Sequence, residues 1–136
     1  MKPILYVSLL SLFLTSCSME DSHLSIMVYN DLSDSIAYIR DQRIFIHERP
    51  NMFDSLPELN QSIKLIKPYD YYVDEIMLPE THFERFPDGK TRIYFLNVDT
   101  LRNYTWKEIR DGSMYLKKYS LSLQDIRDMK NELRIP

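Results

Sequence analysis

The sequence predicts a mainly β or α+β fold: an antiparallel, β-sandwich-like domain with two or three short helices, mostly in its C-terminal half. Three observations support this fold class. Apolar and polar residues alternate over residues 24–28, as in a strand with one buried face. Residues 91–98 contain a continuous apolar run, which is typical of a strand covered on both faces. Two helix-capping patterns lie in the last third, at Thr105 and Ser122.

The front of the chain is predicted to form strands joined by turns. Residues 30–34 carry the Asn, Asp and Ser side chains that favour turns, and residues 36–39 resume a strand pattern. We therefore expect a hairpin between this strand and the first one. A third β-prone run covers residues 43–47, and residues 51–59 are expected to form a surface loop.

The middle of the chain is predicted to contain strands and one short helix. Residues 63–73 form a long apolar and aromatic run interrupted by Pro68, so an edge strand, a bulge or two short strands are all open. A short helix over residues 80–86 is expected before the turn at Pro87-Asp88-Gly89. The apolar run at 91–98 then predicts a strand in the middle of the sheet.

The last third has the clearest helix signals. Residues 105–108 match a capping box, and residues 122–125 match a similar one with Asp in place of Glu. Between these helix starts, residues 114–119 are expected to form a strand, and residues 133–136 could add a final one. The second helix should turn a narrow apolar stripe toward a core, namely Leu123, Ile126 and Met129.

The beginning of the chain resembles the signal peptide of a bacterial lipoprotein. Leu14-Thr15-Ser16-Cys17 resembles a lipobox, in which the cysteine takes a diacylglycerol. Lys2 supplies a positive start, and the apolar run at 4–14 is shorter than the roughly 20 residues that span a bilayer. We expect cleavage between Ser16 and Cys17 and lipid attachment at Cys17; a free or catalytic thiol is the alternative.

This signal divides the chain into a signal peptide at 1–16, an acylated tether at 17–23 and a single globular β-rich domain at 24–136. Removing 16 of the 136 residues leaves 120, with 16 basic and 20 acidic side chains and a net charge of −4. The basic residues are scattered, which argues against a nucleic-acid partner. Cys17 is the only cysteine, so stability must come from packing rather than from an internal disulfide.

A set of residues spread over most of the mature chain carries a family resemblance. These residues are Asn30, 33–36, Phe95, 99–101, Trp106, Glu108, Ile109, 117–123 and Asp125. The set is similar to a family of small uncharacterised Bacteroidota lipoproteins. The chain departs from that family at Lys130-Asn131, where such relatives tend to carry Asn-Trp before a final strand.

The resemblance implies a location and a fold but no activity. We expect a lipid-anchored protein of the cell envelope, on the outer membrane, with the periplasmic or surface face left open. Glu20 and Asp21, shortly after Cys17, resemble the surface-export signal of such lipoproteins; a solvated linker is the alternative.

The sequence predicts no catalytic residue, metal site or cofactor. The histidines, at 23, 47 and 82, lack the spacing of a metal-binding helix. Acidic pairs, such as Asp74 with Glu75 or Glu80 with Glu84, could supply acid and base groups as in glycosidases. Carboxylates on a solvated surface are the alternative explanation.

Tyrosines supply the strongest binding hypothesis. If residues 69–72 lie on one strand, Tyr69 and Tyr71 project to one face and could form an aromatic platform for a sugar or a peptide, while Tyr72 points to the other face. The alternative is that the platform face is core, because strands favour tyrosine for packing.

A repeated Asp-Ser/Thr-aliphatic triplet resembles the acceptor motif for O-glycosylation in exported Bacteroidota proteins. The acceptors would be Ser35, Ser55 and Thr100. Asp and Ser also favour turns for backbone reasons, which is the alternative.

Together, these features predict a lipid-anchored envelope protein that acts as a non-catalytic binding or accessory module. Its partners would be membrane lipid through Cys17 and a protein or a glycan. Two other functions stay open: a small hydrolase that uses paired acids, and a structural subunit of an outer-membrane assembly.

Overall fold

The computed structural model describes residues 23–42 and 63–135. The signal peptide, Ser16, Cys17, Ser55 and the elements expected at 43–47 and 51–59 therefore lie outside the described residues. The described elements are β1 His23–Asn30, β2 Ile36–Arg40, β3 Lys64–Ile66, β4 Tyr71–Met77, α1 Pro79–Glu84, β5 Lys90–Asn97, α2 Val98–Asn103, α3 Trp106–Asp111, β6 Lys117–Ser122, α4 Leu123–Asp128 and β7 Glu132–Ile135.

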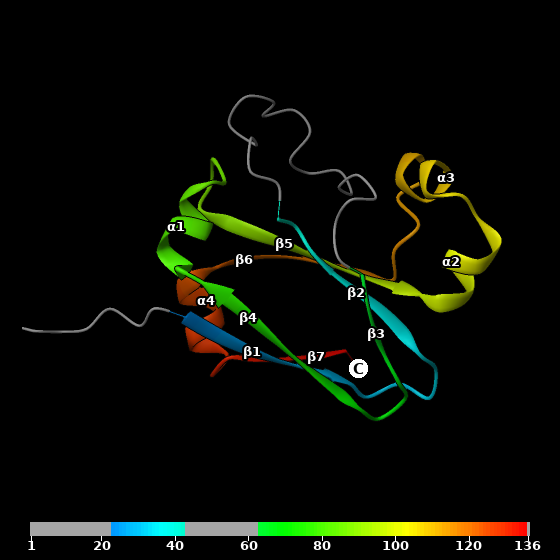
Figure 1. The fold of residues 1–136 in the computed structure, drawn as a ribbon, viewed down its shortest axis with the longest axis horizontal. Helices are drawn as coiled ribbons and strands as arrows, with labels where there is room; N and C mark the ends of the chain where they lie inside the picture. Colours follow the sequence, from blue (N-terminus) through cyan, green and yellow to red (C-terminus); the bar gives the residue numbers. More distant parts are fainter. Residues whose placement is uncertain (1–22, 43–62, 136) are drawn as a thin grey trace, which may run out of the picture.

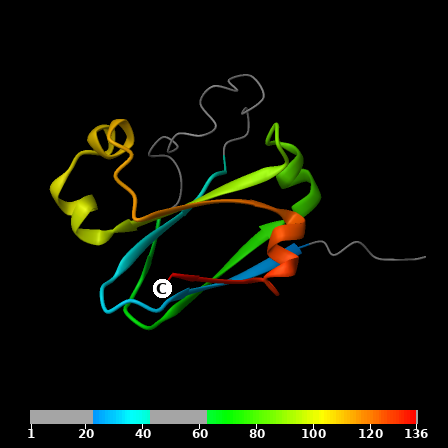
Figure 2. The same ribbon diagram turned by 180° about the vertical axis from the view of Figure 1, so that it is seen from behind.

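The strands form two sheets that face each other (Figure 1). Sheet A has the order β4-β1-β7, with β1 antiparallel to β4 and parallel to β7. Sheet B has the order β3-β2-β5-β6, and all its neighbouring strands are antiparallel. Seen from behind, α4 closes one end of the molecule between β6 and β7 (Figure 2). The expected mainly β or α+β fold with two facing sheets is confirmed, but the described residues form four short helices where two or three were expected, and β1 pairs with β7 in parallel.

The predicted hairpin between the first two strands is wrong. β1 and β2 lie in different sheets and do not pair with each other. Asn30 explains the crossing, because its buried amide donates hydrogen bonds to the carbonyls of Asp34, Ile66 and Lys67 at 2.8, 3.1 and 3.0 Å. These bonds tie the β1–β2 connection to the connection between β3 and β4, so the chain moves from one sheet to the other.

The main core fills the space between the sheets. The alternating pattern of β1 places Leu24, Ile26 and Val28 inside, where they meet Phe95 of β5 and Ile126 of α4. Ile126 is fully buried, with Leu123 and Met129 partly buried beside it, so the predicted apolar stripe of α4 is confirmed.

A second core lies on the far side of sheet B. Tyr94 and Leu96 of β5 point there, opposite to Ile93 and Phe95, and pack with Ile109 of α3. This explains the continuous apolar run that predicted a strand inside the sheet: β5 is buried on both faces and has β2 and β6 as neighbours.

The remaining predictions differ mainly at element boundaries. The run at 63–73 forms two short strands, each at the edge of its sheet, with the turn at Pro68 between them. Both predicted capping boxes are present, at Thr105 and Ser122. The strand expected at 114–119 begins instead at Lys117, because the amides of Met114 and Tyr115 donate to the carbonyls of Ile109 and Ser113 rather than to a neighbouring strand. The helix α2 was not predicted.

Candidate functional site

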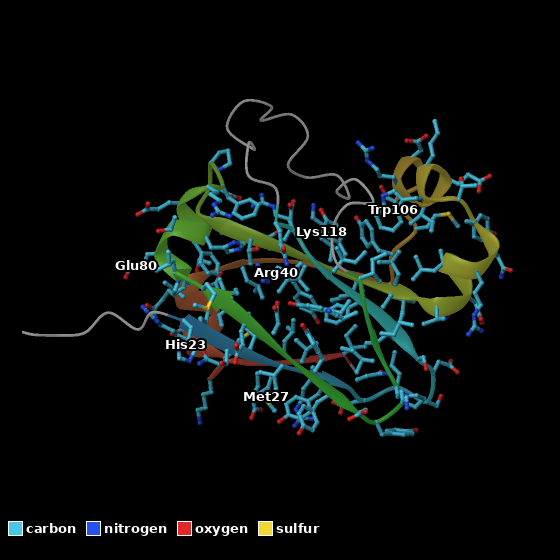
Figure 3. The ribbon with its side chains drawn as sticks, viewed as in Figure 1. His23, Met27, Arg40, Glu80, Trp106 and Lys118 are labelled. Carbon is cyan, nitrogen blue, oxygen red and sulfur yellow. The ribbon has the colours of Figure 1, made fainter. Side chains whose placement is uncertain are left out.

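The candidate site is the outer face of sheet A, which is the surface that points away from sheet B. Figure 3 shows Met27 on this side of β1, whereas Arg40 lies between the sheets. The outer face has side chains from three strands, and these include Met27, Tyr29, Tyr71, Val73, Glu75, Met77, Glu132 and Arg134.

One row of this face crosses all three strands. The register places Tyr29 opposite Tyr71 on one side and Arg134 on the other. The two tyrosine rings have centroids 5.9 Å apart, and the Arg134 guanidinium lies 4.1 Å from the centre of the Tyr29 ring. Asp31 accepts hydrogen bonds from Arg134 at 3.2 Å. Because each member is held by the next, the row offers flat, ordered side chains to a ligand.

A second feature of this face is the exposed apolar surface of β4. Tyr71 is 54% exposed, Val73 37% and Met77 66%, and the adjoining turn adds Tyr69 at 75%. Tyr71, Val73 and Met77 share the outer face because they alternate along β4. Concentration of such side chains on one surface is typical of interaction sites, whereas scattered ones are ordinary.

The two predicted platform tyrosines are both exposed, but they do not share a strand. Tyr69 lies in the turn before β4 with a φ of 55°, so the prediction that it alternates with Tyr71 on one strand is wrong. The aromatic partner of Tyr71 is Tyr29 from the neighbouring strand. Tyr72 is partly buried and packs on Tyr38 between the sheets, with ring centroids 5.9 Å apart. The missed partners, Tyr29 and Arg134, become visible only once the strand register is known.

The inner face of β4 has a buried charged cluster. Asp74 accepts hydrogen bonds from Arg40 Nε at 2.6 Å and from the Tyr38 hydroxyl at 2.5 Å. Burial, followed by the Asp74 charge, raises the pKa of Tyr38 well above its usual value. Asp74 and Glu75 point to opposite faces of the sheet, so they do not converge as a catalytic pair would. The Asp74 carboxylate is instead bound by neighbouring side chains.

His82 is also part of the interior. Its Nε2 lies 3.0 Å from the Thr91 hydroxyl. Burial, with smaller contributions from Arg40 and Arg85, lowers the pKa of His82 to about 4, so the ring is neutral at pH 7. Glu80 and Glu84 are exposed on the same helix, away from His82. No group of three potential metal-binding side chains occurs within the part of the chain that the structure describes.

The described glycosylation candidates lie in different surroundings. Ser35 is partly buried just before β2, and Thr100 is partly buried within α2, where its carbonyl accepts a hydrogen bond from the Tyr104 amide. Their modification stays a prediction.

Comparison of the chain with protein-family models, curated proteins and solved structures finds no match. The resemblance to Bacteroidota lipoproteins therefore stays a prediction. Within the described residues, every helix is too short or too polar to cross a bilayer.

Proposed function

We propose that this protein is a lipid-anchored, non-catalytic binding module of the cell envelope and that the outer face of sheet A binds a protein partner. The exposed apolar surface of β4, continued by the row of Tyr71, Tyr29 and Arg134, is the observation that carries the proposal. Its side chains are not used to build either core.

The composition of the outer face favours a protein over a glycan. Tyr, Met and Arg are enriched at protein interfaces, and Tyr and Arg often dominate their binding energy. Val73, Met27 and Met77 give aliphatic contacts along the face, whereas a sugar site relies on aromatic stacking and hydrogen-bonding groups. A glycan partner is therefore an outcome of the test.

The anchor would keep the partner close to the membrane. Only five residues lie between Cys17 and His23, where β1 begins, so an acylated Cys17 would hold β1 within about 20 Å of the lipid. The partner would have to be an envelope component or a protein that reaches the membrane surface.

The binding proposal can be tested by photo-crosslinking in cells. A photoreactive amino acid replaces Val73 on the outer face, and in a matched control it replaces the exposed Lys107 on α3. We expect a discrete adduct from position 73, and we expect protease digestion to remove it. The yield of this adduct should fall when Tyr71→Ser and Arg134→Ser are introduced together. An adduct that resists protease but is removed by periodate would indicate a glycan. No adduct, or the same adduct from both positions, would contradict the proposed surface.

The anchor is tested separately with Cys17→Ser. We expect the variant to leave the membrane fraction, because it has no thiol to acylate. If processed protein still fractionates with membranes as the wild type does, the lipid-anchor part of the proposal is wrong.

A further inference from the structure

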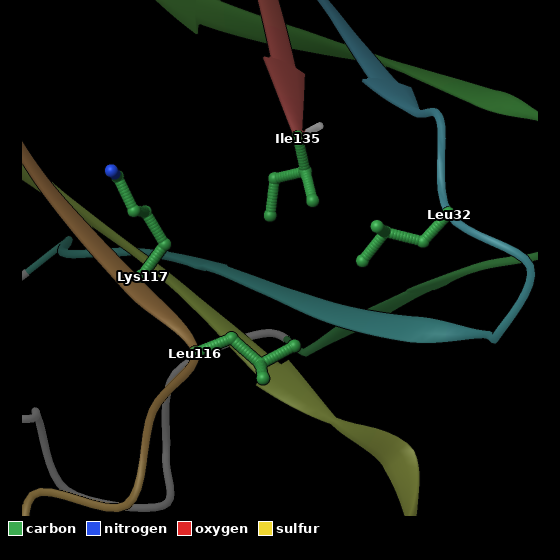
Figure 4. Close-up of a pocket in the computed structure, with 4 residues that line it drawn as sticks. All are labelled: Leu32, Leu116, Lys117 and Ile135. Atoms are coloured by element: carbon green, nitrogen blue, oxygen red, sulfur yellow. The ribbon is translucent and has the colours of Figure 1, made fainter.

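A cleft opens where the two sheets separate. β6 and β7 are the edge strands of sheets B and A, and they do not pair with each other. The cleft lies where β6 begins and β7 ends, has a volume of about 300 Å³, and is lined by Leu32, Leu116, Lys117 and Ile135 (Figure 4).

The fold explains why this end is open. At the other end of the same seam, α4 joins β6 to β7 and inserts the fully buried Ile126 between the sheets. At the cleft, the side chains come from the β1–β2 connection and from the strand ends, and Leu116 stays 51% exposed. A large aliphatic side chain beside a cavity leaves apolar surface that a ligand could cover.

The lining has a simple chemical character. Leu32, Leu116 and Ile135 are aliphatic, so they can hold a hydrocarbon chain but cannot orient it by hydrogen bonds or aromatic stacking. Figure 4 shows the Lys117 side chain along one wall with its ammonium pointing away from Leu32. The stem of a lysine can line an apolar site while its charge stays in water.

Lys117 is available to bind an anion. Its ammonium lies 5.5 Å from the centre of the Tyr119 ring, and none of the ion pairs between described residues includes it. The cleft therefore combines an apolar wall with a single positive charge at its rim.

We propose that this cleft binds a small aliphatic carboxylate, with the hydrocarbon chain against Leu32, Leu116 and Ile135 and the carboxylate at the Lys117 ammonium. The volume is at the lower end of the roughly 300–1,000 Å³ found for small-molecule sites, so the ligand is a medium-length chain rather than a whole lipid. This site uses none of the residues of the outer face of sheet A, so it does not depend on the proposed function.

The test compares octanoate with octanol as probes of the full mature chain carrying Cys17→Ser. Binding is followed through the NMR methyl signals of the aliphatic lining residues. We expect octanoate to shift these signals and Lys117→Met to weaken octanoate binding about fivefold while leaving octanol binding unchanged. The matched control is Lys107→Met, which removes an exposed lysine from α3 and should leave both probes unaffected.

A second variant tests the apolar part. Leu116→Asp changes a half-exposed position, so the chain should fold, and it should abolish the binding of both probes. Equal binding of octanoate to the wild type and Lys117→Met would overturn the role of Lys117. Methyl shifts elsewhere in the molecule, or none, would overturn the site itself.

Discussion

The outer faces of the two sheets differ in burial: that of sheet B is covered, and that of sheet A is exposed. The outer face of sheet B is covered, since Tyr94, Leu96 and Ile39 pack beneath Ile109 of α3 in a second core. The outer face of sheet A instead has exposed apolar side chains, including Tyr71 and Met77. Figure 1 shows α3 on the side of sheet B away from sheet A.

The difference separates residues that stabilise the fold from residues that do not. Apolar surface removed from water contributes about 25 cal/mol per Å² to folding, and sheet B gains this contribution on both faces. Sheet A gains most of it on its inner face, so substitutions of its exposed outer side chains should cost little stability. Apolar side chains that do not stabilise the fold are candidates for binding a partner.

The largest expected effect comes from the inner face of sheet A. Asp74→Ala would leave Arg40 buried without its carboxylate partner, and we expect a loss of about 3–5 kcal/mol in the free energy of unfolding. Urea unfolding measures it. The control is Glu75→Ala on the outer face of the same strand, which should change stability by no more than about 0.5 kcal/mol. Similar losses from both variants would show that the two faces of β4 are not distinct.

Truncation on the two outer faces compares them directly. Ile109→Ala should destabilise the protein by about 2–5 kcal/mol, because Ile109 is fully buried against sheet B. Val73→Ala, on the outer face of sheet A, should cost less than about 1 kcal/mol. Thermal or urea unfolding measures the stability loss of each variant. A larger loss for Val73→Ala than for Ile109→Ala would contradict the difference between the two outer faces.

Acid should destabilise the protein through His82. Its pKa is about 4 in the folded protein and 6.5 when unfolded, so the unfolded chain binds the proton more tightly. The contribution of neutral His82 is complete above pH 6.5 and is lost as the pH falls toward 4, a change of about 3 kcal/mol. His82→Gln should remove this component from the pH dependence of unfolding. A variant with the wild-type profile between pH 4 and 6.5 would be inconsistent with a buried neutral ring.

A stability effect smaller than those of Asp74, Ile109 and His82 is expected at the start of α3, the helix that covers sheet B. The Thr105 side chain accepts a hydrogen bond from the Glu108 amide, and Glu108 returns one to the Thr105 amide at 2.8 Å. Thr105→Ala should cost about 1 kcal/mol, while Thr105→Ser keeps the capping oxygen and should cost much less. Calorimetric melting can resolve the two, and equal losses would mean that the cap oxygen is not what stabilises α3.

Local patterns predicted most of the elements but not how they meet. Alternation in β1, the apolar run of β5 and the two capping boxes are local signals, and each produced the expected element. The β1–β2 hairpin was wrong because β1 pairs with β4 and β7, which are distant in the sequence, and the Asn30 amide likewise bonds to carbonyls 36 and 37 residues away. The helix α2 was missed although Asn97 caps it by accepting a hydrogen bond from the Asp99 amide.

The candidate site was predictable only in part. Tyr71 was identified because the tyrosines cluster in sequence, and its exposure fits the platform hypothesis. Its true neighbours, Tyr29 and Arg134, come from strands 42 and 63 residues away along the chain, and only the register of sheet A brings them together. The wrong placement of Tyr69 arose because the strand pattern was extended through the turn that follows Pro68.

The most direct test of the binding surface is hydroxyl-radical footprinting in native envelopes and on the isolated mature chain. Mass spectrometry measures the oxidation rates of Tyr71 and Met77, which lie on the outer face of sheet A. The internal reference is Tyr104, which lies beside α3 and is 47% exposed. If a partner covers this face, Tyr71 and Met77 oxidise several times more slowly in envelopes, relative to Tyr104, than in the isolated chain. Unchanged ratios between the two preparations would contradict the account.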